Sequence, residues 1–137
     1  MPAAAIRLME LDDNRHCCDA ELHAHMSQSS KARHTHHYVA MEDNLEVAFL
    51  ALDQIPGVDY LVLYEIFVRQ DHRRRGIGSR LLREVEALAA NLGYGKITLS
   101  PSPLEHSFPE ARLIAWYKRL GYVERPDCPT ELEKSID

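Results

Sequence analysis

The sequence predicts one mixed α/β domain, in which short strands and amphipathic helices alternate along the chain. The first observation is the length of 137 residues, the usual size of a compact domain, so residues 1–137 are assigned to one domain. The second is the composition, because 45% hydrophobic and 27% charged residues are typical of globular chains and argue against disorder. The third is the hydrophobic pattern, which changes repeatedly between strand-like runs and helical spacing.

The N-terminal part predicts a strand, a helix and a hairpin. Residues 5–11 form a short apolar run, as expected of a first strand. Asp12 and Asp13 are suitable N-caps for a helix that continues through Cys17 to Met26. The hairpin is predicted to have its strands at 38–41 and 45–52 and its turn at 42–44.

The middle of the chain contains the clearest strand and the clearest helix. Tyr60–Val68 is dense in branched and aromatic residues, which predicts a strand buried on both faces. Apolar residues then recur at helical spacing from Ile77 to Leu92, and Gly93 supplies a stop. The two elements are therefore expected to pack together around the core.

The C-terminal part predicts a strand, a helix and one last short strand. Residues 97–99 are a brief apolar run, and a second amphipathic helix is expected from about Glu110 to Gly121. Residues 122–123 are expected to open the last strand, and Cys128 is assigned to a proline-flanked tail. The whole order indicates a mixed sheet with helices against it.

Charge and apolar run lengths exclude several classes of protein. The chain has 16 Lys and Arg against 21 Asp and Glu, and this net charge of -5 argues against a general nucleic-acid binder. The longest apolar run, 47–52, is far shorter than the ~20 residues of a membrane span, and no signal-peptide pattern is visible. Three cysteines, two of them adjacent, make a poor disulfide framework, so a reduced, cytoplasmic protein is expected.

The corner between the central strand and the long helix suits an anion. It consists of Arg73, Arg74, Arg75, Gly76, Ile77, Gly78 and Ser79. Glycine lets the backbone approach a ligand closely, and the first N–H groups of a helix attract negative charge. The arginines add side-chain cations, so a phosphate or pyrophosphate is the expected ligand. The alternative is a solvated basic turn that binds nothing.

Two known phosphate motifs do not fit this corner. A dinucleotide fingerprint would need a third glycine where Leu81 stands. A P-loop would need Gly-Lys followed by Ser or Thr, and here Gly78 is followed by Ser79 and Arg80. The corner therefore has to be assigned from its wider context.

That context resembles the GNAT superfamily of N-acetyltransferases. The corner is similar to the Gln/Arg-x-x-Gly-x-Gly/Ala acetyl-CoA motif of that family, with Glu65-Ile66-Phe67-Val68 before it. Residues 114–122, Ile-Ala-Trp-Tyr-Lys-Arg-Leu-Gly-Tyr, resemble the family's Ala-x-x-Leu-Tyr-x-x-x-Gly-Phe ending. The resemblance implies a mostly antiparallel central sheet, flanked by helices and splayed at the acetyl-CoA site. It places the acetyl-CoA half at about 60–123 and a variable acceptor half at about 1–58.

The resemblance also implies roles for individual residues. Main-chain groups of Ile66, Phe67 and Val68 would contact the acetyl carbonyl and the pantetheine arm, and amides of residues 73–79 would hold the pyrophosphate. Tyr117 matches the tyrosine that protonates the departing thiolate, although it also suits a core aromatic position. Glu65 lies on the acetyl-binding strand and is the candidate base, with Tyr64 and the histidines around His36 as competitors.

One position departs from the family pattern. Members usually carry an asparagine seven residues before the tyrosine, where this chain has Glu110. A carboxylate beside CoA phosphates is unfavourable, so either Glu110 points away from the cofactor or Ser107 makes that contact instead.

The predicted function is transfer of an acetyl group from acetyl-CoA to a primary amine of a small molecule or peptide, by direct attack and without a metal. The alternative is a non-catalytic acyl-CoA-binding or partner-binding module on the same fold. A third hypothesis is a zinc-binding domain that uses the five histidines between His23 and His37, which the loose ligand spacing disfavours. The resemblance leaves a homodimer as one option for assembly.

Overall fold

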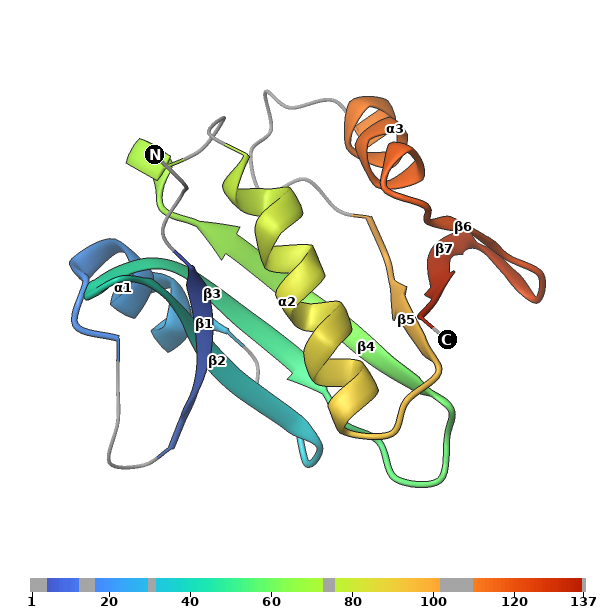
Figure 1. Cartoon of the computed structure of the whole chain (residues 1–137), viewed down its shortest axis with the longest axis horizontal. Helices are drawn as coiled ribbons and strands as arrows, with labels where there is room; N and C mark the ends of the chain where they lie inside the picture. The colour runs from blue at the N-terminus through green and yellow to red at the C-terminus, as the bar shows by residue number, and fades with distance from the viewer. Residues whose placement is uncertain (1–4, 13–16, 30–31, 73–75, 102–109, 137) are drawn as a thin grey trace.

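Seven strands form one sheet that carries helices on both faces (Figure 1). The computed structural model describes residues 5–12, 17–29, 32–72, 76–101 and 110–136. The strands are β1 (Ile6–Leu11), β2 (Thr35–Glu42), β3 (Leu45–Asp53), β4 (Tyr60–Val68), β5 (Lys96–Leu99), β6 (Val123–Arg125) and β7 (Cys128–Ser135). The helices are α1 (Ala20–Gln28), α2 (Ile77–Asn91) and α3 (Glu110–Arg119), with a short 3-10 turn η1 (Gln70–His72) after β4.

The strand order in the sheet is β1-β2-β3-β4-β5-β7-β6. All neighbouring pairs are antiparallel except β4 and β5, which run parallel and are connected through α2. A parallel pair requires such a crossover, because a short turn can only reverse the chain. The predicted mixed and mostly antiparallel sheet is confirmed.

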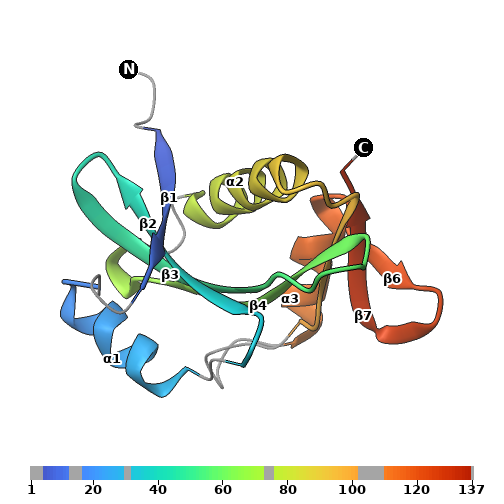
Figure 2. The same cartoon turned by 90° about the horizontal axis from the view of Figure 1, so that it is seen from below.

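Helices α2 and α1 lie on opposite faces of the sheet (Figure 2), and each face has a hydrophobic core of its own. On one face, α2 buries five side chains at helical spacing against the sheet, and α3 contributes Tyr117 to the same core. On the other face, α1 contributes Leu22, which packs with Phe49 and Ala51 of β3. No helix among the described residues is long and apolar enough to cross a membrane.

The start of α1 differs from the prediction. Its N-cap is Asp19, whose Oδ2 accepts a hydrogen bond of 3.0 Å from the N–H of Leu22. Asp13 lies outside the described residues, and Asp12 precedes the helix by several residues. The cause is a distant carboxylate, because Glu46 Oε1 on β3 accepts from the N–H groups of Cys18 and Asp19 at 2.8 and 2.7 Å. A contact across 27 residues of sequence cannot be predicted from local capping rules.

The C-terminal tail is a strand, contrary to the prediction. β7 forms a hairpin with β6 and pairs antiparallel with β5, so that Leu132 lies opposite Leu99. Leu132 is its one buried hydrophobic residue within the described part of the chain. Charged neighbours hide the strand pattern, and they pair across strands in the fold, as Glu133 does with Arg125 at 3.4 Å.

Candidate active site

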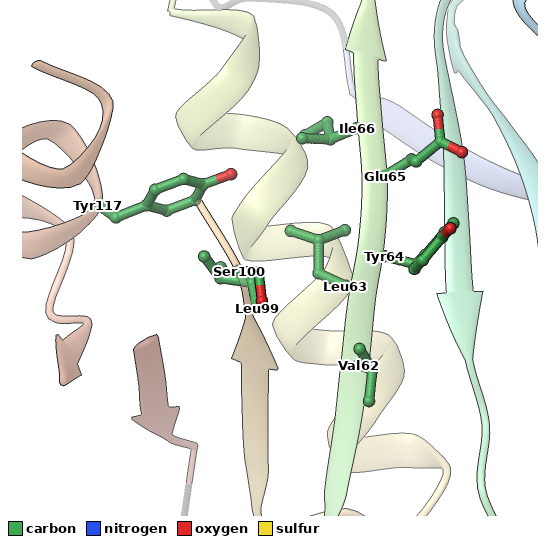
Figure 3. Close-up of a pocket in the computed structure, with 8 residues that line it drawn as sticks. All are labelled: Val62, Leu63, Tyr64, Glu65, Ile66, Leu99, Ser100 and Tyr117. Atoms are coloured by element: carbon green, nitrogen blue, oxygen red, sulfur yellow. The ribbon is translucent and has the colours of Figure 1, made fainter. Parts of the chain in front are cut away.

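The sheet opens between β4 and β5. Their parallel pairing runs only from Tyr60 opposite Lys96 to Leu63 opposite Leu99. There β5 ends, whereas β4 continues to Val68 with β3 as its one strand partner in the described structure. A cavity of about 370 Å³ occupies the opening. Its lining consists of Val62, Leu63, Tyr64, Glu65, Ile66, Leu99, Ser100 and Tyr117 (Figure 3).

A β-bulge in β4 sets which side chains face each side of this opening. Leu63 pairs with Leu52 of β3 and Glu65 pairs with Ala51, so Tyr64 is an extra residue without a partner of its own in the ladder. Strict alternation would place Leu63 and Glu65 on one face. With the bulge, Leu63 and Ile66 lie on the α2 side of β4, while Tyr64 and Glu65 project to the other side (Figure 3). Only Leu61 and Leu63 of β4 are buried, Tyr64 is exposed and the other residues are half-buried, which corrects the prediction of a strand buried on both faces.

Tyr117 reaches the opening from α3. Its side chain extends toward β4 past the end of β5 (Figure 3) and is only 5% exposed. Trp116 and Tyr122 make edge-to-face contacts with it at 4.9 and 5.6 Å between ring centroids. Burial raises the pKa of Tyr117 to about 12. The hydroxyl is therefore a proton donor throughout the neutral range.

Glu65 reaches the opening from β4, on the side of α1. Its Oε1 accepts a hydrogen bond from Ser29 Oγ at 2.6 Å, and its Oε2 lies 2.7 Å from His25 Nε2. The side chain is 19% exposed, so a ligand in the cavity can still contact it. Sequence reasoning selected Glu65 but missed both partners, because they lie 36 and 40 residues away on another element.

The start of α2 forms the predicted glycine corner. Gly76 is the N-cap in the left-handed region at φ 74°, a conformation that favours glycine. The intrahelical ladder begins with Arg80 N–H donating to Gly76 C=O, so the N–H groups of Ile77, Gly78 and Ser79 precede it. Gly78 packs closely against Trp116 of α3, and a Cβ at this position would lie only 3.0 Å from the ring. The side chain of Ile77 belongs to the core, which leaves only its backbone for a ligand.

The remaining residues predicted to contact the cofactor lie partly outside and partly within the described structure. Arg73, Arg74 and Arg75 lie outside the described residues. Ile66 lines the cavity, and Val68 packs on the α2 side of the sheet. Phe67 faces α1, where its ring stacks on His25. Glu110 begins α3 with an exposed side chain, which is consistent with a carboxylate directed to solvent, and Ser107 lies outside the described residues.

Two arginines that flank the glycine corner, Arg69 and Arg80, form ion pairs within the fold. Arg69 forms ion pairs with Asp19 and Asp71 at 3.3 and 2.9 Å. Arg80 forms an ion pair with Glu42 at 2.7 Å. These two arginines therefore connect elements of the fold.

The histidines between His23 and His37 do not converge on one point. His36 pairs with Glu10 at 2.8 Å, His37 is buried against Phe49, and His25 pairs with Glu65. Among the described residues, no group of three or more His, Cys, Asp or Glu side chains is arranged to hold a metal ion. The part of the segment that the structure describes thus gives no support to the zinc hypothesis.

Known structures share this fold over nearly the whole chain. A ribosomal-protein-alanine N-acetyltransferase from Escherichia coli superposes with a TM-score of 0.65 at 16% identity, covering 96% of this chain and 94% of that one. A GNAT family acetyltransferase from Elizabethkingia anophelis with acetyl-CoA bound gives 0.64 at 14% identity, covering 95% and 97%. The PaiA N-acetyltransferase from Thermoplasma acidophilum in complex with coenzyme A gives 0.55 at 18% identity, covering 72% and 59%. Identities this low establish similarity of fold.

A family model establishes the relationship. No curated protein matches the sequence significantly. Residues 33–124, about two thirds of the 137 residues, match the model described as an acetyltransferase (GNAT) domain. This match confirms the family inferred from the glycine corner and the Tyr117 helix, and with it an acetyltransferase. The chain belongs to the GNAT family of N-acetyltransferases.

Proposed function

We propose that this chain transfers the acetyl group of acetyl-CoA to a primary amine of a small molecule or peptide by direct attack. The observation that carries the proposal is that Tyr117 and Glu65 line one cavity from opposite sides of the sheet opening. Tyr117 comes from the side of α2 and α3, and Glu65 projects to the side of α1. A proton donor and a proton acceptor separated in this way suit a reaction in which two substrates meet in the middle.

Acetyl-CoA would bind on the α2 side. Its pyrophosphate would accept hydrogen bonds from the first N–H groups of α2, where the helix dipole favours negative charge. Its pantetheine arm would follow β4 beyond the end of β5, so that the thioester enters the opening beside Tyr117. Main-chain N–H groups near Phe67 and Val68 would stabilise the oxyanion that forms on the acetyl carbonyl.

The amine would enter from the α1 side. The amine nitrogen forms a bond to the acetyl carbon, and the bond between that carbon and the CoA sulfur breaks. An acceptor that arrives as an ammonium ion first loses one proton to water, which frees the lone pair of the nitrogen for attack. As the bond forms, one further proton passes from the nitrogen to the Glu65 carboxylate, and the Tyr117 hydroxyl gives one proton to the thiolate. Exchange with water then returns both side chains to their starting states.

The acceptor would be a cationic amine. The net charge of -5 becomes more negative outside the arginine-rich segment at 69–83, which favours the approach of a polyamine, an aminoglycoside or a peptide amine. Glu65 adds a carboxylate at the cavity itself. The charge of the acceptor therefore steers its encounter with the enzyme.

Two measurements test the proposal. Isothermal titration with acetyl-CoA is expected to show binding, and no detectable heat up to millimolar concentration would defeat it. Release of free thiol from acetyl-CoA, followed across a panel of amines, is expected to accelerate with at least one cationic amine. Tight binding without turnover across the whole panel would favour the non-catalytic module instead.

A further inference from the structure

Helix α1 holds the Glu65 carboxylate by both of its oxygens. Ser29, at the C-cap of α1, bonds to Oε1, and His25 in the last turn of α1 bonds to Oε2. We propose that His25 and Ser29 are positioning residues, which fix the Glu65 carboxylate at the cavity for deprotonation of the acceptor amine. The inference rests on the proposed function, since it assigns Glu65 the role of base.

The chemistry of the three groups determines the direction of both hydrogen bonds. An ionised carboxylate only accepts hydrogen bonds, so the Ser29 hydroxyl donates to Oε1 over 2.6 Å. For the same reason His25 donates its Nε2–H to Oε2 over 2.7 Å. Each carboxylate oxygen has two lone-pair sites, so each has one left for a ligand after these bonds form. The carboxylate is thus oriented by α1 and still able to accept a proton from the cavity.

The His25 ring is itself held in place by aromatic side chains. It stacks on Phe67 with 4.2 Å between ring centroids and 14° between planes. It also contacts Phe49 edge-on at 5.6 Å. Phe67 lies two residues after Glu65 on the same face of β4, so one strand supplies both the carboxylate and the surface that orients its donor. A donor immobilised before the substrate arrives loses little side-chain entropy when it acts.

Location separates the role of His25 from that of Glu65. Glu65 lines the cavity, and His25 does not belong to the lining. His25 therefore acts through Glu65 by aiming the carboxylate oxygen at the amine N–H. A misplacement of a reacting group by about 1 Å costs on the order of 100-fold in rate, so a lost positioning bond has a measurable effect on turnover.

The first test replaces His25 in two ways: one variant keeps an aromatic ring, and the other keeps a hydrogen-bond donor. His25→Phe keeps an aromatic ring on Phe67 but removes the N–H, and kcat is expected to fall at least about tenfold with the acetyl-CoA Kd within about twofold. His25→Gln places an amide N–H near the position of Nε2 and is expected to restore kcat to within about threefold of wild type. The control is Glu10→Gln, which alters another histidine–carboxylate pair, that with His36, at a residue that does not line the cavity. Equal kcat in His25→Phe and wild type would overturn the proposal.

The second test asks whether His25 acts through Glu65. If it does, adding His25→Phe to Glu65→Gln causes no further loss of kcat, because the carboxylate that it positions is already gone. If the losses of kcat in the two single variants multiply in the double variant, His25 acts independently of Glu65, and the proposal is overturned. If Glu65→Gln retains full activity while the wild type turns over, Glu65 is not the base and the positioning role fails with it.

The third test needs no acceptor and separates this inference from the proposed function. The ¹⁵N resonance of His25 Nε2 is expected to move in Glu65→Gln and in Ser29→Ala, and to stay in place in Glu10→Gln. An unchanged resonance in Glu65→Gln would show that the His25–Glu65 pair does not form in solution. That result would overturn the inference whatever the enzyme acetylates. A shifted resonance in a protein that acetylates no amine would leave the pair intact and reject only the proposed function.

Discussion

The two halves of β4 show how one strand serves both the core and the site. From Tyr60 to Leu63 the strand pairs with β5, its last two residues also pair with β3, and Leu61 is completely buried. From Tyr64 to Val68 it pairs only with β3 among the described strands, and each side chain is half-buried or exposed. The change occurs at the bulge, where β5 also ends. A strand edge that no other strand covers is a liability on a surface but useful beside a ligand.

The site therefore forms where the regular pairing of β4 with its neighbouring strands is interrupted. A continuous β4–β5 ladder would satisfy the backbone of both strands and fill the space that the cavity occupies. The bulge at Tyr64 also brings two polar-tipped side chains, Tyr64 and Glu65, to the same side of the sheet. Stability is therefore expected to depend on the paired half of β4, and activity on the open half.

The strongest test of this division compares Leu61→Ala with Ile66→Ala. Leu61 lies in the paired half with no exposed surface, so its truncation is expected to cost about 2–5 kcal/mol of unfolding free energy. Ile66 is only partly buried and lines the cavity, so its truncation is expected to cost less stability and to slow turnover more. Urea unfolding and thiol-release rates on both variants measure the two effects. Equal stability losses would show that the halves are not distinct.

The next largest effect is expected for Tyr117, the proton donor beside the open half of β4. Tyr117→Phe keeps the packing volume and removes the hydroxyl, so kcat is expected to fall about 100-fold while the acetyl-CoA Kd changes little. The matched control is Tyr122→Phe, which also removes a buried hydroxyl, but one that donates to Glu86 at 3.4 Å and does not line the cavity. A loss of less than about threefold in Tyr117→Phe would mean that Tyr117 only packs, or that water supplies the proton.

A smaller effect is expected for the acceptor on the other side of the opening. Glu65→Gln keeps the shape and hydrogen-bonding reach of the side chain but cannot take a proton, so turnover is expected to fall at least about tenfold. Both proteins must be compared on one amine at one pH, because the protonation of the amine itself depends on pH. Equal rates in the two proteins would leave a bound water, Tyr64 or a nearby imidazole as the base.

The smallest effect belongs to the glycine corner that follows the open half. Gly76 and Gly57 both have positive φ, at 74° and 83°, and a Cβ at either would meet nothing within 4 Å. Alanine at either position is therefore expected to cost about 1 kcal/mol or more of stability through backbone strain. Only Gly76→Ala is expected to weaken acetyl-CoA binding, by a few-fold, because its Cβ would stand beside the pyrophosphate. Unchanged affinity in titration calorimetry would place the pyrophosphate elsewhere.

Tertiary contacts decided the features that sequence reasoning missed. The N-cap of α1 depends on Glu46, which lies 27 residues from Asp19. β7 pairs with β5 and places Leu132 opposite Leu99 in the core, although the segment is polar and alternates only weakly. The role of His25 depends on Glu65 and Phe67, both about 40 residues away. In each case the partner lies outside any window in which periodicity or propensity operates.

The sequence by itself determined the helix α2, its glycine corner, the Tyr117 helix and, through them, the family. These features are local, since they rest on 3.6-residue spacing, on the left-handed conformation at Gly76 and on short motifs. The direction of Glu65 was decided only by the tertiary structure. A period of two along β4 says which residues share a face, but the extra residue at Tyr64 reverses that assignment, and a bulge depends on how the neighbouring strand pairs.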